Sequence, residues 1–222
     1  MNEILFCAHV ILLYVIGVMI FQQRREWQVV WLCVMPILAN LTLAKQIMIC
    51  GFEVTSSDVY SVAYFVGMNH YHETYGKKAA FELVRLSMLC IIVMPLLLLM
   101  HTFYLPSVHD VYHEVFVKIF GFVPWVAAVS VASFTLSQYL ERTLFAYSQT
   151  MIQGHYHYRS FITASISQLF DTAFFTFFAV SYLVHQPWHV FIISYVIKQI
   201  IICGWFCISR IHQPEEPHYV RD

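Results

Sequence analysis

The stretch RSFITASISQLFDTAFFTFF, Arg159–Phe178, is typical of a membrane-crossing helix, yet it carries a carboxylate, Asp171, near its middle. Apolar runs of similar length recur along the chain, each near the roughly 20 residues that a helix needs to cross the hydrocarbon core of a bilayer. Of the 222 residues, 59% are hydrophobic and 11% are charged, against about 25% charged residues in a typical soluble domain. The sequence therefore predicts an all-α integral membrane protein.

Hydropathy predicts seven spans. They are Glu3–Phe21, Val29–Cys50, Val59–Tyr71, Glu82–Tyr104, Val115–Gln138, Phe161–Val184 and His189–Ser209, of which the third is short. The first run is followed by two glutamines and two arginines rather than by a small-residue cleavage site, so we expect it to be a retained helix. Between the fifth and sixth spans we expect a polar connection from about Tyr139 to Arg159.

Lys and Arg occur in alternate connections. They follow the first, third, fifth and seventh spans, at Arg24 and Arg25, Lys77 and Lys78, Arg142 and Arg159, and Arg210. The other connections, around Thr55–Asp58, Leu105–Glu114 and His185–Trp188, contain neither. Because positive charge is retained in the cytoplasm, we expect the N-terminus outside, the C-terminus inside, and Asp58, Asp110 and Gln186 facing outward.

Removal of the first span would leave a six-helix core with both ends in the cytoplasm. We therefore divide the chain into an extra N-terminal transmembrane helix and loop (1–27), a six-helix core (28–211) and a cytoplasmic tail (212–222). The tail contains Pro214, Pro217 and mixed charges, which favour disorder.

Two ionisable residues lie near the middle of predicted spans, Asp171 in the sixth and Lys198 in the seventh. A charge at the bilayer centre costs roughly 2.5–3.5 kcal/mol on insertion scales, so such residues are functional-site candidates by default. They lie at similar depth and can pair. A purely structural ion pair is the alternative interpretation.

A polar stripe precedes Asp171. Ser160, Thr163, Ser167 and Asp171 are spaced by three, four and four residues, which places them on one helix face, with Gln168 beside them. A stripe of this length predicts a wet or ligand-filled cavity within the membrane.

Other polar and aromatic residues fit the same cavity. Asn40, near the midpoint of the second span, suits either a cavity or close helix packing, whereas we assign Ser130, Ser133 and Ser137 of the fifth span to packing. Nearby aromatic side chains are Phe174, Phe178, Tyr195 and Trp205. This set of side chains suits a planar, polar heterocycle as ligand. Amides and a carboxylate can bind its edge, and aromatic rings can stack on its face.

Four segments together resemble the queuosine precursor transporter family. They are ANLTLAKQIMICGF (Ala39–Phe52), NHYHETYGKKAA (Asn69–Ala80), YRSFITASISQLFDTAFF (Tyr158–Phe175) and SYVIKQIII (Ser194–Ile202), and the resemblance covers roughly residues 35–205. It implies a six-helix core similar to the substrate-binding components of energy-coupling vitamin importers, working in a bacterial inner membrane without a known ATPase partner.

The resemblance also implies a substrate, a 7-deazaguanine on the path to the tRNA base queuosine. This would be the aminomethyl or cyano base, or free queuine, imported for tRNA modification. Asn40, Gln168, Asp171 and Lys198 match the polar pattern of the family, and Ser167, Phe174, Tyr195 and Trp205 complete the predicted substrate-binding set. The family commonly has Asp where this chain has Asn69, so a second carboxylate at that position is missing.

Other functions remain as alternatives. A transporter of another vitamin or purine-like solute would use the same cavity. A haem protein or intramembrane enzyme would use Asp171, Lys198 and some of the twelve histidines, most of which lie in connections or at span ends. We expect no enzymatic activity, metal or cofactor, because the sequence has no nucleophile motif or P-loop and no haem-ligand pattern. The net charge of −1 does not indicate a nucleic-acid partner. The expected partners are therefore the small solute and membrane lipid.

Overall fold

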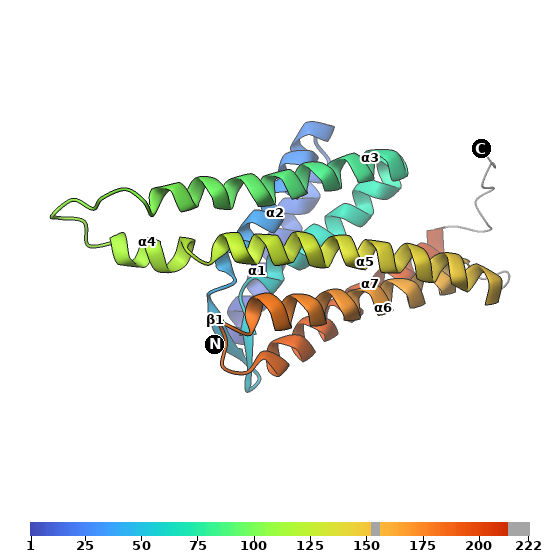
Figure 1. Cartoon of the computed structure of the whole chain (residues 1–222). Coiled ribbons are helices and arrows are strands. Elements are labelled where there is room, and N and C mark those ends of the chain that lie inside the picture. Colours follow the sequence, from blue (N-terminus) through green and yellow to red (C-terminus); the bar gives the residue numbers. More distant parts are fainter. Residues whose placement is uncertain (152–155, 213–222) are drawn as a thin grey trace.

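A computed structural model describes the backbone of residues 1–151 and 156–212 (Figure 1). It describes their side chains apart from those of residues 142, 149–151, 156–157, 160, 201 and 205–212. The predicted disordered tail lies, from residue 213 on, outside the described residues.

The chain is mostly helical. Its helices are α1 (Asn2–Phe21), α2 (Arg25–Thr42), α3 (Asp58–His101), α4 (His113–Phe120), α5 (Val123–Met151), α6 (Tyr156–Phe175), which continues into the π-helical turn Thr176–Val180, and α7 (Pro187–His212). Five segments of the described chain are long and apolar enough to cross a membrane: Asn2–Phe21, Asp58–His101, His113–Ser148, Phe161–Val180 and Pro187–Gly204. The protein is therefore a multi-pass membrane protein.

Helix α3 contains two of the predicted spans. Its backbone leaves the helical conformation at Gly76, where φ is 80° and ψ is 173°, a region that glycine adopts readily because it has no Cβ. At this residue the chain reverses direction, so α3 consists of two arms joined by a tight bend (Figure 1). The short third span, predicted as Val59–Tyr71, is the first arm and is longer than expected.

The second span was predicted to continue to Cys50, and this is wrong. Helix α2 ends at Thr42, and an antiparallel hairpin follows, formed by β1 (Gln46–Ile49) and β2 (Phe52–Thr55). Cys50 and Gly51 both have positive φ, 51° and 83°, as a two-residue hairpin turn requires. The apolar run Ile47–Ile49 therefore belongs to a strand, and the all-α prediction fails at this hairpin.

The predicted polar connection from Tyr139 to Arg159 is also mostly helical. Helix α5 continues to Met151, and α6 already begins at Tyr156. The Arg159 guanidinium lies 5.9 Å from the centre of the Phe145 ring. Aromatic side chains in this segment thus give α5 and α6 contacts beyond the apolar spans.

Helix α1 is peripheral. It packs against α2, α3 and β1, and Leu13 and Gly17 are its buried residues. Near its start, Asn2 donates to the Met48 carbonyl and Glu3 accepts from the Cys50 amide, both at 3.1 Å. The hairpin therefore holds the first helix.

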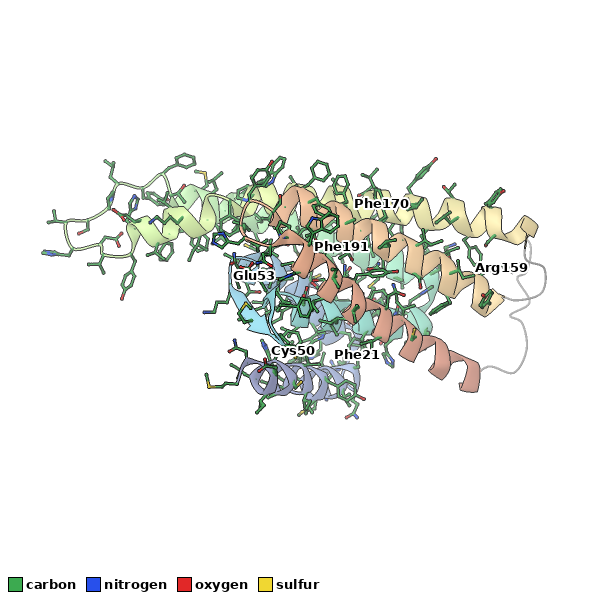
Figure 2. The ribbon with its side chains drawn as sticks, turned by 90° about the horizontal axis from the view of Figure 1, so that it is seen from below. Phe21, Cys50, Glu53, Arg159, Phe170 and Phe191 are labelled. Atoms are coloured by element: carbon green, nitrogen blue, oxygen red, sulfur yellow. The ribbon has the colours of Figure 1, made fainter. Side chains whose placement is uncertain are left out.

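Connections gather at two ends of the structure. The N-terminus, the hairpin and the α6–α7 connection lie at one end, whereas the α3 bend, the end of α5 and the start of α6 lie at the other (Figure 1). Figure 2 shows Cys50 beside α1 and Glu53 on the α7 side of the hairpin. Glu53 accepts a hydrogen bond from the Gln186 amide at 3.0 Å, and the Gln46 side chain donates to the Leu183 carbonyl. The hairpin thus joins the first and last helices at one end.

Candidate functional site

The two ionisable residues predicted within the membrane form an ion pair. Lys198 Nζ lies 3.0 Å from Asp171 Oδ2 and donates a second hydrogen bond, at 3.1 Å, to Thr172 Oγ1. Both charged side chains remain about one-fifth exposed, at 23% and 21%. The predicted pairing is confirmed, and the residual exposure leaves polar atoms available to a ligand.

A serine of α5 completes the surroundings of Asp171. Ser133 Oγ lies 2.7 Å from Asp171 Oδ1 and 3.1 Å from its main-chain carbonyl. Ser133 thus makes a contact between α5 and α6, as its assignment to helix packing predicts, and this contact reaches the Asp171 carboxylate. An ionised carboxylate offers about four acceptor positions, so roughly two remain open on Asp171 beyond the contacts from Ser133 and Lys198.

A cavity of about 180 Å³ opens beside this pair, between α2, α3, α5, α6 and α7. Four of the predicted site residues line it: Asn40, Gln168, Asp171 and Lys198. Further polar lining comes from Ser57, Ser61, Ser87 and Ser130, and aromatic lining from Tyr64, Phe65, Phe134 and Phe175. Drug-sized sites are usually roughly 300–1,000 Å³, so this cavity suits a single small heterocycle.

Asn40 provides the strongest sign of a ligand. Its side chain is 4% exposed, and its Nδ2 has no hydrogen-bond partner in the part of the chain that the structure describes. A buried donor without an acceptor costs about 1–3 kcal/mol. Because Asn40 also lines the cavity, a bound solute or water there can accept its hydrogen bond.

The remaining predicted site residues are not among the lining residues. Ser167 is buried against α5 and donates to the Ser137 carbonyl at 2.7 Å. The Phe174 ring stacks on Phe178 with centroids 4.6 Å apart, and Tyr195 is parallel to Phe191 at 6.3 Å. The Trp205 side chain lies outside the described residues.

The polar stripe is therefore divided between two environments. Thr163 donates to the Arg159 carbonyl at 3.0 Å and is buried, and Ser167 serves the α5–α6 contact, whereas Gln168 and Asp171 face the cavity. The Ser160 side chain lies outside the described residues. Helical spacing places residues on one face but does not say whether a neighbouring helix or a cavity lies opposite.

Sequence reasoning missed the lining of α3. Ser57 occupies the N-cap position of its first arm, and Ser61, Tyr64 and Phe65 lie within this arm, which has too short an apolar run to stand out by hydropathy. The spacing of Ser57, Ser61 and Tyr64, by four and three residues, places them on one helix face and is the signal that could have found them.

Asp58, predicted to lie in an outward-facing connection, is the first residue of α3, and its side chain is buried. It is 9% exposed and accepts a hydrogen bond from Ser194 Oγ of α7 at 2.8 Å. A helix N-terminus stabilises a negative charge by about 0.3–1 kcal/mol, whereas a charge within the membrane costs roughly 2.5–3.5 kcal/mol at its centre. The helix end therefore offsets a minor part of the cost of burying this carboxylate.

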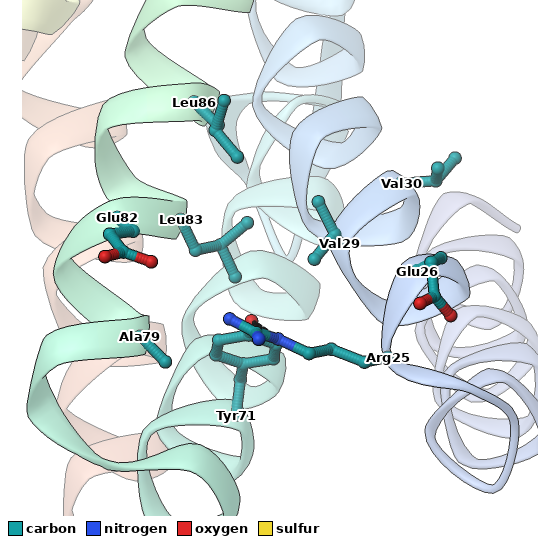
Figure 3. A pocket seen from close by; sticks show the side chains of 9 residues that line it. All are labelled: Arg25, Glu26, Val29, Val30, Tyr71, Ala79, Glu82, Leu83 and Leu86. Atoms are coloured by element: carbon teal, nitrogen blue, oxygen red, sulfur yellow. Dashed lines mark hydrogen bonds between the residues drawn. The ribbon is translucent and has the colours of Figure 1, made fainter.

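A second cavity, of about 390 Å³, lies between α2 and α3 (Figure 3). Arg25 Nε donates to Tyr71 Oη at 2.7 Å, and the guanidinium lies 5.3 Å from the centre of the Tyr75 ring. These contacts hold the start of α2 against the bend of α3. Glu26 and Glu82 at this cavity are exposed, so the smaller cavity, with its buried unpaired amide, is the better candidate for a solute site.

The helices define a multi-pass membrane protein that encloses a small polar cavity. A family described as "Putative vitamin uptake transporter" matches residues 57–208, more than half of the chain. The chain belongs to this family of membrane transporters.

One curated relative agrees with the resemblance noted in the sequence. A Bacillus subtilis (strain 168) protein described as "Probable queuosine precursor transporter" is 28% identical over 191 residues, which cover 83% of this chain and 80% of the relative. No solved structure matches the chain.

Proposed function

We propose that this protein imports a queuosine precursor, a 7-deazaguanine base or queuine, for tRNA modification. The observation that carries the proposal is the unpaired amide of Asn40 in the same cavity as the Asp171 carboxylate. The description of the Bacillus subtilis relative supports the same substrate class.

The donors and acceptors of the cavity complement the edge of a guanine-like base. Such a base carries a ring N–H and an exocyclic NH₂ side by side, and Asp171 can accept from both through its open acceptor positions. The Asn40 amide can donate to the ring carbonyl, and the Gln168 amide can donate or accept. Asp171 is therefore the main recognition residue, assisted by Asn40 and Gln168.

Aromatic side chains supply the faces of the proposed site. Tyr64 and Phe65 enter from α3, Phe134 from α5 and Phe175 from α6. Rings at offset or edge geometry favour a planar heterocycle over a flexible aliphatic solute. These four residues replace the aromatic set expected from the sequence.

We also propose that the first 27 residues are an addition to a six-helix core at 28–211. The peripheral packing of α1 supports this division. The alternating positions of Lys and Arg support a bacterial inner-membrane protein with its N-terminus outside and the bend at Gly76 in the cytoplasm.

A cell assay tests the proposed function. Cells that lack their own precursor synthesis and uptake are complemented with this chain and fed the aminomethyl base, the cyano base or queuine separately, and the queuosine content of their tRNA is measured. At least one base should restore queuosine. If none does, the family member carries another vitamin or purine-like solute.

A variant tests the assigned recognition residue. Hydrogen bonds to a charged group contribute about 1.5–3 kcal/mol each, so Asp171→Asn should weaken binding of the active base more than tenfold. Asp110→Asn, in an exposed loop after α3, is the matched control and should bind normally. A well-expressed Asp171→Asn protein with native affinity would show that Asp171 is only a structural partner of Lys198.

A further inference from the structure

One buried carboxylate has no role in the proposed substrate site. Asp58 is the one Asp, Glu, Lys, Arg or His that is buried within the described residues, and it is absent from the lining of the cavity. Its hydrogen-bond partner is the Ser194 hydroxyl, at 2.8 Å. A single neutral donor does not compensate an ionised carboxylate for the loss of water.

Helix α7 connects this carboxylate to the substrate site. Ser194 and Lys198 are four residues apart and therefore lie on one face of α7. Ser194 contacts Asp58, and Lys198 contacts Asp171. Two carboxylates from α3 and α6 thus lie along the same face of one helix.

Lys198 also acts on Asp58 electrostatically. Helices α1, α2, α5 and α7 pack against α3, and within the described part of the chain the charged group that interacts with Asp58 is Lys198. The ammonium is already hydrogen-bonded to Asp171 and Thr172. One positive charge therefore serves two carboxylates, which leaves an excess of one negative charge when both are ionised.

We propose that Asp58 is a proton-binding site whose occupancy is linked, through Lys198, to the binding of solute at Asp171. A proton on Asp58 balances the charge of the group and leaves Lys198 with Asp171, which is the arrangement that the structure shows. Without the proton, the two carboxylates compete for the same ammonium.

The linkage has a definite sign, and this part rests on the proposed function. A base that donates to Asp171 takes over part of its negative charge and weakens its hold on Lys198. The ammonium is then available to an ionised Asp58, so the carboxylic acid releases its proton to water. Binding of base and protonation of Asp58 should therefore oppose each other.

The first test needs no solute. Infrared spectra of the purified protein at neutral pH should contain the C=O band of a protonated carboxylic acid. The band should be lost in Asp58→Asn, weakened in Asp171→Asn because Lys198 is then free to pair with an ionised Asp58, and retained in the exposed-loop control Asp110→Asn. If the band is missing from the wild-type protein, or is unchanged in Asp58→Asn, the proton site is refuted whether or not the chain transports a 7-deazaguanine.

Folding gives a second measure of the same site. Because Asn resembles a protonated Asp in size and lack of charge, Asp58→Asn should reach at least the wild-type yield of monodisperse protein. The contrasting variant Lys198→Ala, which leaves Asp171 without its cation, should have a lower yield. A collapse of yield in Asp58→Asn alone would indicate that Asp58 is ionised in the folded protein and would contradict the proposal.

The linkage is tested with the 7-deazaguanine base that supports queuosine formation in the cell assay. Base added to weakly buffered wild-type protein should release up to one proton per base bound, seen with a pH-indicator dye. The Kd should rise as the pH falls, by at most tenfold per pH unit for one proton. Asp58→Asn should bind without proton release and with a flat pH profile.

The outcomes separate the two proposals. Wild-type protein that binds the base with no proton release and no pH dependence refutes the linkage but leaves the transporter assignment intact. Protein that binds no base refutes the assignment, while the infrared band still decides whether Asp58 carries a proton.

Discussion

The unpaired amide of Asn40 predicts a variant that is more stable and binds worse. Asn40→Leu keeps a similar side-chain size and removes a buried donor that lacks an acceptor, which costs about 1–3 kcal/mol. The apo protein should gain stability of that order, which for a chain of this size corresponds to about 2–12 °C in Tm. Base binding should lose one neutral hydrogen bond, about 0.5–1.5 kcal/mol, or about 2- to 13-fold in Kd.

The measurements are thermal unfolding of purified protein in detergent and titration with the active base. Gln28→Leu is the contrast, because Gln28 is a buried amide on the same helix whose Nε2 donates to the carbonyls of Phe21 and Gln23, so the substitution loses two hydrogen bonds while it removes one unpaired acceptor, Oε1. It should lower Tm and leave the Kd of folded protein unchanged. A lower Tm for Asn40→Leu, or an unchanged Kd, would refute the assignment of the Asn40 amide to a ligand.

Three further experiments test the ion pair, the packing and the topology. Lys198→Ala should lower folded yield and transport, because it leaves Asp171 unpaired. The cost should be below the roughly 3–5 kcal/mol of breaking a fully buried pair, because both side chains are partly exposed. The double variant Lys198→Ala with Asp171→Asn should recover yield but not transport. Gly67→Ala should destabilise by about 1–3 kcal/mol, measured as Tm, because its Cβ would lie 2.8 Å from a Leu32 methyl; an unchanged Tm would show that the helices can separate. In a Cys-depleted background, Gln186→Cys should react with an impermeant thiol reagent added outside and Lys77→Cys should not, and the reverse pattern would invert the topology.

Much of the helical architecture follows from the sequence because hydropathy reports directly on transfer into lipid. The long apolar runs gave the helices, and the alternating charges predicted which connections share an end. The hairpin at Gln46–Thr55 was missed because a short apolar run has the same composition in a strand and in a helix. The extension of α5 was missed because the segment after Gln138 is too polar to register as a span by hydropathy.

The charged part of the candidate site was predictable, because a charge within the membrane has a high free-energy cost. Asp171 and Lys198 stand out because few residues of their kind are tolerated in a span, and their pairing followed from equal depth. The surroundings of Ser133, Ser167 and Asp58 did not follow from the sequence, because they depend on how the helices are rotated and on where α3 begins. Neither the helical period nor hydropathy contains that information.

The tight bend at Gly76 has a consequence for biogenesis. The two arms of α3 are separated by so little chain that the translocon cannot release one into lipid and hold the other. The second arm contains the strongly apolar run Cys90–Met100, whereas the first arm carries Ser61 and Tyr64, which line the cavity. We therefore expect the two arms to insert together as a helical hairpin. The apolar second arm then supplies the free energy of insertion for the more polar first arm. Lengthening the bend with a flexible linker should leave the first arm outside the bilayer in a fraction of molecules. A glycosylation tag placed before the first arm would then lie on the opposite side of the membrane in that fraction.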